Sequence, residues 1–138
     1  GINVISTPAA HPKITRDQYG RLEFVGYMLE FDNKRLYVSG DTSVTEELLR
    51  ILSVLPPIGM AMLPVNEHNF FRDRQKIIGN MSIREAFLFA EELQIKRLIP
   101  VHWDMFDCNS ALPEEIKVIY EGYNWEFKLI KNISEINF

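Results

Sequence analysis

The segment "IPVHWDMF", residues 99–106, ends a predicted β-strand and places polar side chains directly after it. The strand runs from Arg97 to Val101 and is mostly apolar, which is typical of a buried strand. His102 and Asp104 follow it at once, among aromatic and apolar residues that more often pack than react. Ligands of α/β proteins gather at the carboxyl ends of strands. This stretch therefore predicts an α/β fold class and the place of a functional site.

Strand-like and helix-like runs alternate along the rest of the chain. The predicted strands are 3–9, 24–31, 35–39 and 60–65, with a terminal pair at 127–130 and 133–138. A hairpin turn is predicted at 32–34. Predicted helices begin at two capping boxes, Ser43 with Glu46 and Ser82 with Glu85, and at Pro113; Pro56-Pro57 ends the first. This order predicts a mixed sheet with flanking helices.

Composition limits the partners of the protein. The 138 residues suffice for one domain, and 46% hydrophobic with 25% charged residues indicate a soluble globular chain. The net charge of −4 and the lack of a basic block argue against a nucleic-acid partner. No apolar run approaches the roughly 18 residues that span a bilayer. Cys108 is the only cysteine, which fits a reducing compartment, so we expect a cytoplasmic protein with a small-molecule substrate and no membrane partner.

Three polar residues follow predicted strands and are candidate metal ligands. His11 follows "VISTPAA", Asp41 follows "RLYVSG" and His102 follows "RLIPV". Each by itself is more often a turn, cap or strand-edge residue. Together they supply the imidazole and carboxylate donors that hold a divalent ion while leaving a position for water.

The loop at 66–80 supplies candidate substrate-binding residues, because long loops in compact domains often bind ligands. The Asn66 amide could contact hydroxyl or carbonyl groups, or it could end the strand as a turn residue. His68 is either a surface loop residue or a substrate contact. Arg72 and Arg74 could clamp a phosphate or carboxylate, although solvated charges are commoner. The backbone at Gly79-Asn80 could attract an anion or could only serve the turn.

Asp104 is a candidate catalytic residue beside Asp41 and His102. It stands two residues after His102, so the two side chains face the same side if the chain stays extended. In that arrangement the Asp104 carboxylate could orient the His102 ring or a bound water molecule.

Five stretches in this order, "STPAAH", "LYVSGDT", "MLPVN", "GNMSIREA" and "IPVHWDMF", resemble the carboxyl half of the metallo-β-lactamase-fold hydrolases. The resemblance extends from Val4 to about Tyr120 and is nearest to the branch that includes L-ascorbate-6-phosphate lactonase. It implies half of a four-layer αββα sandwich with metals at the seam. It further implies that His11 binds one metal, that Asp41 bridges two metals and that His102 completes the second.

The chain departs from the family pattern in two places. The family's His-x-His-x-Asp-His stretch has no counterpart among His11, His68 and His102. Glu67-His68-Asn69 stands where a Gly-Arg-Asp run is common in the lactonase-like branch, which bears on the substrate. We therefore expect residues 1–138 to be the carboxyl half of one domain, inactive alone, with a second copy or the absent amino half as its partner.

The expected function is that of a metal-dependent hydrolase with one or two divalent ions, zinc or manganese. A metal-bound hydroxide would open a lactone or ester of a sugar-like, possibly phosphorylated substrate. Two alternatives remain at this point. One is a phosphodiesterase of the same fold, and the other is a metal-free binding or scaffold module.

Overall fold

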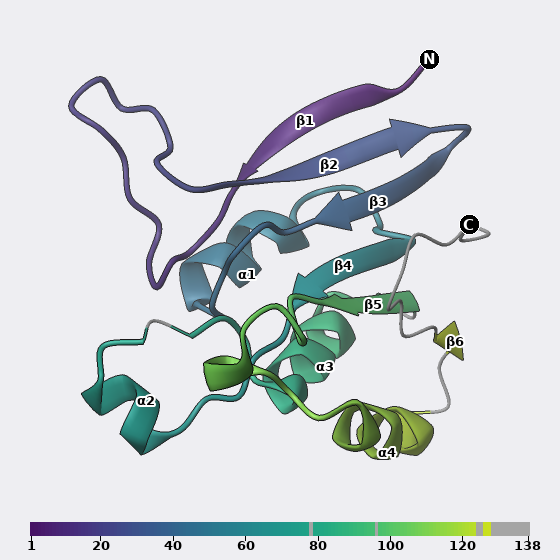
Figure 1. Ribbon diagram of the computed structural model, residues 1–138. Coiled ribbons are helices and arrows are strands. Elements are labelled where there is room, and N and C mark those ends of the chain that lie inside the picture. The colour runs from purple at the N-terminus through teal and green to yellow at the C-terminus, as the bar shows by residue number, and fades with distance from the viewer. Residues whose placement is uncertain (78, 96, 124–125, 128–138) are drawn as a thin grey trace.

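The computed structural model describes residues 1–77, 79–95, 97–123 and 126–127. Within these residues the chain forms a six-stranded sheet with flanking helices (Figure 1). The strands are β1 (Asn3–Pro8), β2 (Val25–Phe31), β3 (Lys34–Val38), β4 (Met60–Pro64), β5 (Arg97–Val101) and β6 (Glu126–Phe127), and they lie in the sheet in chain order. The helices are α1 (Glu46–Ser53), α2 (Phe70–Arg74), α3 (Ile83–Glu92) and α4 (Pro113–Tyr123), with a 3₁₀ turn at Asp107–Asn109. The predicted α/β fold class is confirmed.

The first three strands form an antiparallel meander with a tight hairpin between β2 and β3. Asp32 and Asn33 at the turn have φ angles of 47° and 61°. Two consecutive residues with positive φ are the mark of a type I′ turn, whose twist matches that of the paired strands. Beside the turn, Arg35 Nε donates to Glu30 Oε1 at 2.7 Å, and this hydrogen bond lowers the pKa of the Glu30 carboxyl. The predicted hairpin is confirmed.

The remaining strand pairs are parallel, and this sets the direction in which the strands end. β1 and β3 are each antiparallel to β2, so β1 has the same direction as β3. β1, β3, β4 and β5 therefore end at the same edge of the sheet (Figure 1). The loops that follow these four strands meet at that edge.

α3 begins at the predicted capping box. Ser82 Oγ accepts from the Glu85 amide at 3.3 Å, and Glu85 Oε2 accepts from the Ser82 amide at 2.8 Å. Both reciprocal hydrogen bonds satisfy amides that the first helical turn leaves unpaired. The apolar stripe of this helix is buried at Ile83, Ala86, Phe87, Phe89 and Ala90.

The prediction that Ser43 caps the first helix is wrong. Thr45 is the N-cap of α1, because its side chain accepts from the Leu48 amide at 3.2 Å. Ser43 instead donates from its hydroxyl to the Gly79 carbonyl at 3.1 Å. The Ser43 hydroxyl is engaged with another loop, so the cap moves two residues along the chain. α1 ends at Ser53, before the two prolines that were expected to stop it.

The core lies against one face of the sheet. Met28, Tyr37, Ala61 and Leu98 are paired in register across β2, β3, β4 and β5, and each is at most 2% exposed. Because side chains alternate across a strand, residues in one register row share a face. Burial raises the pKa of the Tyr37 hydroxyl well above its ordinary value.

The opposite face of the sheet is apolar and partly exposed; we refer to Val4, Tyr27, Val38 and Met62 as the outer face. Tyr27, Val38 and Met62 are paired in register. Each is the sequence neighbour of a core residue in the same strand, so its side chain lies on the opposite face. Val4 is 57% exposed and Tyr27 is 43% exposed, while the other two are partly buried. Exposed apolar area of this kind is a feature of surfaces that bind a partner.

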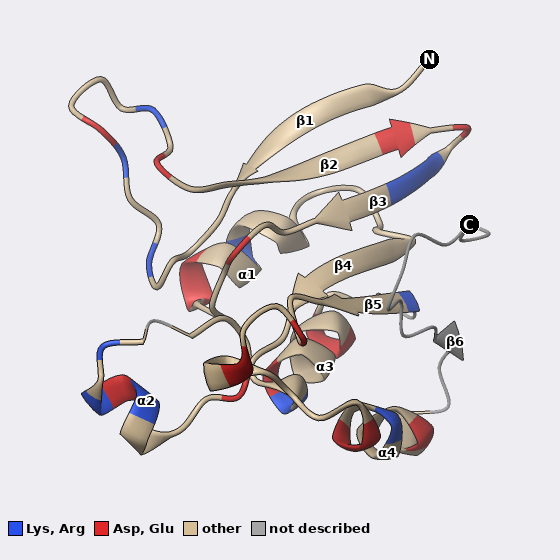
Figure 2. Cartoon of the chain, viewed as in Figure 1, with Lys and Arg blue, Asp and Glu red and all other residues tan. Residues whose placement is uncertain are grey.

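Charge is mixed over the described part of the chain. Basic and acidic residues alternate on α2 and on the hairpin, and no described element carries a one-sided basic face (Figure 2). None of the described helices has the length and apolar character needed to cross a membrane. The predicted terminal strand pair at 127–130 and 133–138 lies outside the described residues, apart from Phe127 in β6.

Candidate metal centre

The predicted site residues lie on loops at one edge of the sheet. His11 lies in the loop after β1, and Asp41 in the loop after β3. The segment from Asn66 to Asn80 follows β4, and His102 follows β5. The strand directions, and not sequence proximity, bring these loops together.

Asp41 and His102 approach each other at this edge. His102 Nε2 lies 3.7 Å from Asp41 Oδ1, with side chains 13% and 51% exposed. This separation is too long for a hydrogen bond. Two donor atoms at 2.0–2.2 Å from one tetrahedral ion lie about 3.4 Å apart, which is close to the observed spacing. The pair therefore has the donor chemistry and the separation of two ligands to one divalent ion.

The His102 ring is oriented by the residues around it. His102 has a φ of 65°, which turns the chain away from the direction of β5. Its Nδ1 lies 3.1 Å from Asn66 Nδ2, and its ring packs against the Phe106 ring at 5.8 Å between centroids. Nδ1 therefore faces the protein, and Nε2 faces Asp41. Nε2 is the nitrogen that is left to bind a metal.

Asn66 joins the end of β4 to the loop after β5. Its Nδ2 donates toward the His102 carbonyl at 3.1 Å, the Asn109 carbonyl at 3.1 Å and Asn109 Oδ1 at 3.0 Å. Its Oδ1 accepts from Asn80 Nδ2 at 2.9 Å. We call Asn66, Asn80 and Asn109 the asparagine network; all three are buried. Asn66 Nδ2 is a donor, so it bonds to His102 Nδ1 only when the ring proton is on Nε2. A metal on Nε2 would place the proton on Nδ1, and the Asn66 hydrogens would then go to the carbonyl oxygens alone.

The asparagine network was not predicted as such. Asn66 and Asn80 were predicted to bind substrate, and that role stays a prediction. The Asn66 amide and Asn80 Nδ2 are engaged with the protein, whereas Asn80 Oδ1 is buried with no hydrogen-bond partner among the described residues. Asn109 was missed by sequence reasoning. It stands in a short 3₁₀ turn, where no hydrophobic period or motif distinguishes a buried asparagine from a turn residue.

His11 lies in a loop that is tied to the loop of Asp41. The Ala10 amide donates to Thr42 Oγ1 at 2.8 Å, and the Ser43 amide donates to the Ala10 carbonyl at 2.7 Å. His11 Nδ1 is buried with no hydrogen-bond partner among the described residues. A buried imidazole nitrogen without a partner is costly and is free to accept a ligand.

The three predicted ligands do not together form a complete metal-binding group. Over the described ranges, no group of three or more His, Cys, Asp or Glu side chains is close enough to hold a metal ion. The structure brings Asp41 and His102 together, and it places His11 in the neighbouring loop. The place of His11 in a metal site stays a prediction.

The geometry expected for Asp104 is wrong. The chain does not stay extended after β5, because His102 adopts positive φ and residues 102–105 form a bend and turn. Trp103 is buried at 4% exposure, whereas Asp104 is exposed. Strand alternation therefore does not place Asp104 beside His102, and its catalytic role stays a prediction without that support.

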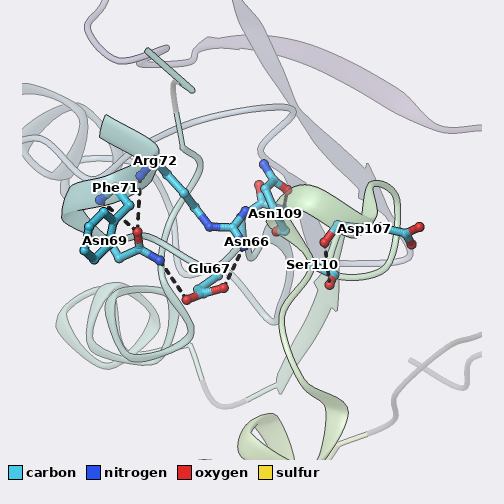
Figure 3. Close-up of polar contacts among 8 residues, drawn as sticks. All are labelled: Asn66, Glu67, Asn69, Phe71, Arg72, Asp107, Asn109 and Ser110. Atoms are coloured by element: carbon cyan, nitrogen blue, oxygen red, sulfur yellow. Dashed lines mark hydrogen bonds and ion pairs between the residues drawn. The ribbon is translucent and has the colours of Figure 1, made fainter. Parts of the chain in front are cut away.

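The loop expected at 66–80 contains α2, which Asn69 caps by accepting from the Phe71 and Arg72 amides at 3.0 and 3.2 Å (Figure 3). Asn69 also donates to Glu67 Oε1 at 2.7 Å. His68 Nε2 lies 3.0 Å from an oxygen of Asp73. The segment is therefore ordered by its own side chains, and the prediction of a loop across 66–80 is wrong at Phe70–Arg74, which forms a helix.

Two cavities open beside this segment, and His68 lines both. One, of about 410 Å³, lies between His68, Pro12 and Ser43 and so adjoins the loops of His11 and Asp41. The other, of about 490 Å³, includes Asn66 and Arg72 in its wall and so adjoins His102 through the asparagine network. Both volumes suit a small-molecule ligand.

An imidazole and a carboxylate at the carboxyl ends of the strands of an α/β sheet are the donor types of a divalent-metal site. A family model described as a beta-lactamase superfamily domain matches residues 1–103. The chain therefore belongs to the metallo-β-lactamase superfamily. The lactonase branch to which the sequence was assigned is not among these findings, and it stays a proposal.

Curated relatives are named UPF0173 metal-dependent hydrolases. The protein of Thermococcus onnurineus is 27% identical over 117 residues, which cover 85% of this chain and 47% of the relative. That of Korarchaeum cryptofilum is 31% identical over 117 residues, which cover 85% of this chain and 45% of the relative. The chain spans about half the length of the curated relatives it matches.

Solved structures share the fold. Igni18, described as a novel metallo hydrolase from the archaeon Ignicoccus hospitalis, superposes with a TM-score of 0.69 at 23% identity, covering 94% of this chain and 50% of that one. The metallo-beta-lactamase fold protein YhfI of Bacillus subtilis gives 0.65 at 12% identity, covering 94% and 47%. At these identities the likeness concerns the fold alone.

Proposed function

We propose that this chain forms part of a metal-dependent hydrolase that opens a lactone or ester of a sugar-like substrate. The observation that carries the proposal is the 3.7 Å approach of His102 Nε2 to Asp41 Oδ1 at the edge where four strands end. When bound there, a divalent ion such as zinc or manganese would act as a Lewis acid and would lower the pKa of a bound water molecule toward neutrality.

The side chains of this chain have separate tasks in the proposal. His102 and Asp41 would hold the ion, and Asn66 holds the His102 backbone in place by donating to its carbonyl at 3.1 Å. His11, with its unpartnered Nδ1, is proposed as a further ligand. Asp104 is exposed near the same edge and is proposed to carry protons between the site and solvent.

Two other functions are distinguishable from this one. A phosphodiesterase would use the same donors, but the acidic net charge of −4 does not favour a nucleic-acid substrate. A metal-free binding or scaffold module would explain why three ligands do not close around one ion in the described residues. The fit of the Asp41–His102 spacing to a tetrahedral ion favours the hydrolase over the module.

Metal content and a substrate panel test the proposal. We expect the full-length protein to retain zinc or manganese after purification and to hydrolyse lactones or carboxylate esters faster than phosphodiesters. A chelator should abolish turnover, and the metal should restore it. Faster cleavage of phosphodiesters would assign the alternative enzyme, and a metal-free, inactive full-length protein would assign the binding module.

We also propose what covers the outer face of the sheet. Because the ligand set is open and the relatives are about twice as long, we propose that the remaining ligands come from residues outside this chain. A second layer supplied by those residues would cover Val4 and Tyr27. The cytoplasm is the proposed compartment, because the exposed Cys108 is a free thiol.

Residues 1–138 expressed alone should therefore form dimers or aggregates. The reason is the exposed apolar area at Val4 and Tyr27, which a second copy would bury. Light scattering after size exclusion gives the mass, and the double variant Val4→Thr, Tyr27→Thr should shift it toward the monomer. A monomeric wild-type chain with a cooperative melt would contradict the proposed role of the outer face.

A further inference from the structure

His68 and Asp73 form a side-chain pair, the His68–Asp73 dyad, to which the proposed reaction gives no task. His68 Nε2 lies 3.0 Å from Asp73 Oδ1, and the two side chains are 42% and 55% exposed. An ionised carboxylate only accepts hydrogen bonds, so in the neutral ring the proton lies on Nε2 and the lone pair on Nδ1. In the described part of the chain, no second side chain pairs with His68, so Nδ1 is available to a ligand.

The dyad lies against the segment that joins the loops of the candidate metal centre. The His68 ring packs on Gly79, where an added Cβ would lie 3.6 Å from ring atom Cδ2. The Gly79 carbonyl accepts from Ser43 Oγ at 3.1 Å, and Ser43 stands two residues after Asp41. One residue, Gly79, therefore separates the His68 ring from the loop that carries the Asp41 carboxylate.

The same segment reaches His102 on its other side. Asn80, the residue after Gly79, donates from Nδ2 to Asn66 Oδ1 at 2.9 Å. Asn66 in turn donates to the His102 carbonyl at 3.1 Å. His68 lines the cavity of about 410 Å³ together with Asn80, and it lines the cavity of about 490 Å³ together with Asn66. A ligand in either cavity can therefore touch His68 while it adjoins a loop that carries a proposed metal ligand.

The proposed reaction needs a proton for the oxygen that leaves the carbonyl carbon. When a lactone or an alkyl ester opens, the electron pair of the broken bond stays on that oxygen, and an alkoxide leaves poorly unless an acid protonates it. Carboxylate, guanidinium and ammonium groups ordinarily titrate far from neutral pH, whereas an imidazole exchanges protons near it. The other charged residues that line the two cavities are all of the former kinds: Glu67, Arg72, Asp73, Lys76, Arg84, Glu85, Asp107 and Glu115.

We propose that His68 is the catalytic acid that protonates the leaving oxygen, and that Asp73 is its positioning residue. The inference rests on the proposed function, because it adds a residue to that reaction. Hydroxide adds to the carbonyl carbon, the bond from that carbon to the leaving oxygen breaks, and the oxygen takes the proton from Nδ1 of the protonated ring. The proton released when water becomes hydroxide restores that ring, so ester and water give acid and alcohol. Asp73 acts through His68, because its carboxylate holds Nε2 and leaves Nδ1 to the substrate.

Two esters of one carboxylic acid, which differ in their leaving groups, test the assignment in the full-length protein. The alkyl ester needs an acid for its leaving oxygen, whereas the para-nitrophenyl ester does not, because nitrophenolate leaves without a proton. The variants are His68→Gln, which can still donate to Asp73, and Asp73→Asn, whose amide nitrogen can turn toward Nε2 and reverse the tautomer. Gln75→Ala is the matched control, because Gln75 is exposed on the same segment and lines neither cavity.

His68→Gln should lower kcat for the alkyl ester by about 100-fold or more, which is the contribution of a general acid, and should change kcat for the nitrophenyl ester little. Asp73→Asn should show the same dependence on the leaving group with a smaller loss, and Gln75→Ala should match the wild type. Equal losses on the two esters would make the dyad a structural contact of the α2 segment and overturn the inference. An unchanged kcat for the alkyl ester in His68→Gln would overturn it as well.

Proton–nitrogen correlation NMR spectra of the His68 ring give a readout that does not depend on turnover. In the wild type the neutral ring should carry its proton on Nε2, and Asp73→Asn should reduce the population of this tautomer. A proton on Nδ1 in the wild type would overturn the inference whatever the activity. A full-length protein that keeps the expected tautomer but hydrolyses neither lactones nor esters would overturn the proposed function, and the acid role with it.

Discussion

Asp41→Asn in the full-length protein is expected to lower bound metal and to reduce kcat by orders of magnitude. Asparagine keeps the shape of the side chain but loses the charge that offsets the positive charge of the metal. Among the described residues, the Asp41 carboxylate lies nearest to His102 Nε2, at 3.7 Å. The hydrogen bonds that hold the turn are made by the neighbouring Thr42. The melting temperature with chelator present should therefore change little.

Metal analysis and turnover measured side by side on the same preparation check this expectation. Asp32→Asn is the matched control, because Asp32 lies in the hairpin turn at positive φ, where asparagine is well tolerated. The control should keep wild-type metal content and activity. Full metal occupancy with near-normal turnover in Asp41→Asn would make Asp41 a turn residue after Gly40 and would remove the basis of the metal centre.

Asn66→Ala is expected to produce the largest loss of stability. The substitution removes the acceptor of Asn80 Nδ2 and the donor to oxygens of His102 and Asn109, at a site that is 1% exposed. Leaving buried polar groups without partners costs about 3 kcal/mol in total. For a domain of this size that loss lowers Tm by roughly 10 °C. Denaturant titration of the full-length protein with chelator measures it.

Asn3→Ala serves as the control, because Asn3 donates to Glu30 at 2.9 Å on the exposed edge strand. Loss of this exposed hydrogen bond should leave the free energy of unfolding almost unchanged. The pair of variants also separates the two roles considered for Asn66. A rise in KM at unchanged stability would assign Asn66 to substrate binding, whereas lost stability with weakened metal binding would assign it to orienting His102.

The local elements of this fold could be read from the sequence. The hairpin turn at 32–34, the capping box at Ser82 and the buried strand ending at Val101 each depend on residues within a few positions of one another. Such features arise from backbone conformation and short-range hydrogen bonds, which the sequence displays directly. The resemblance of the ordered motifs also identified the superfamily that the family model matches.

Two local predictions from the sequence are wrong, one because of a long-range hydrogen bond and one because of a backbone turn. Ser43 has the spacing of a cap, but the Gly79 carbonyl takes its hydroxyl, and Thr45 caps α1 instead. Asp104 would face the same side as His102 in an extended chain, but the positive φ of His102 turns the chain away. In both cases the residue type was read correctly, and a long-range contact or a backbone turn changed its role.

The sequence by itself determined which donors exist: His11, Asp41 and His102 after strands, and Arg72 in a long loop. Only the tertiary structure decided which of them meet. Parallel pairing of β3, β4 and β5 brings Asp41 to 3.7 Å from His102 and leaves His11 in the next loop. The capped turn of α2 pairs Arg72 with Glu67. Spacing along the chain cannot encode these distances, because they depend on strand register and on which buried polar groups must satisfy one another.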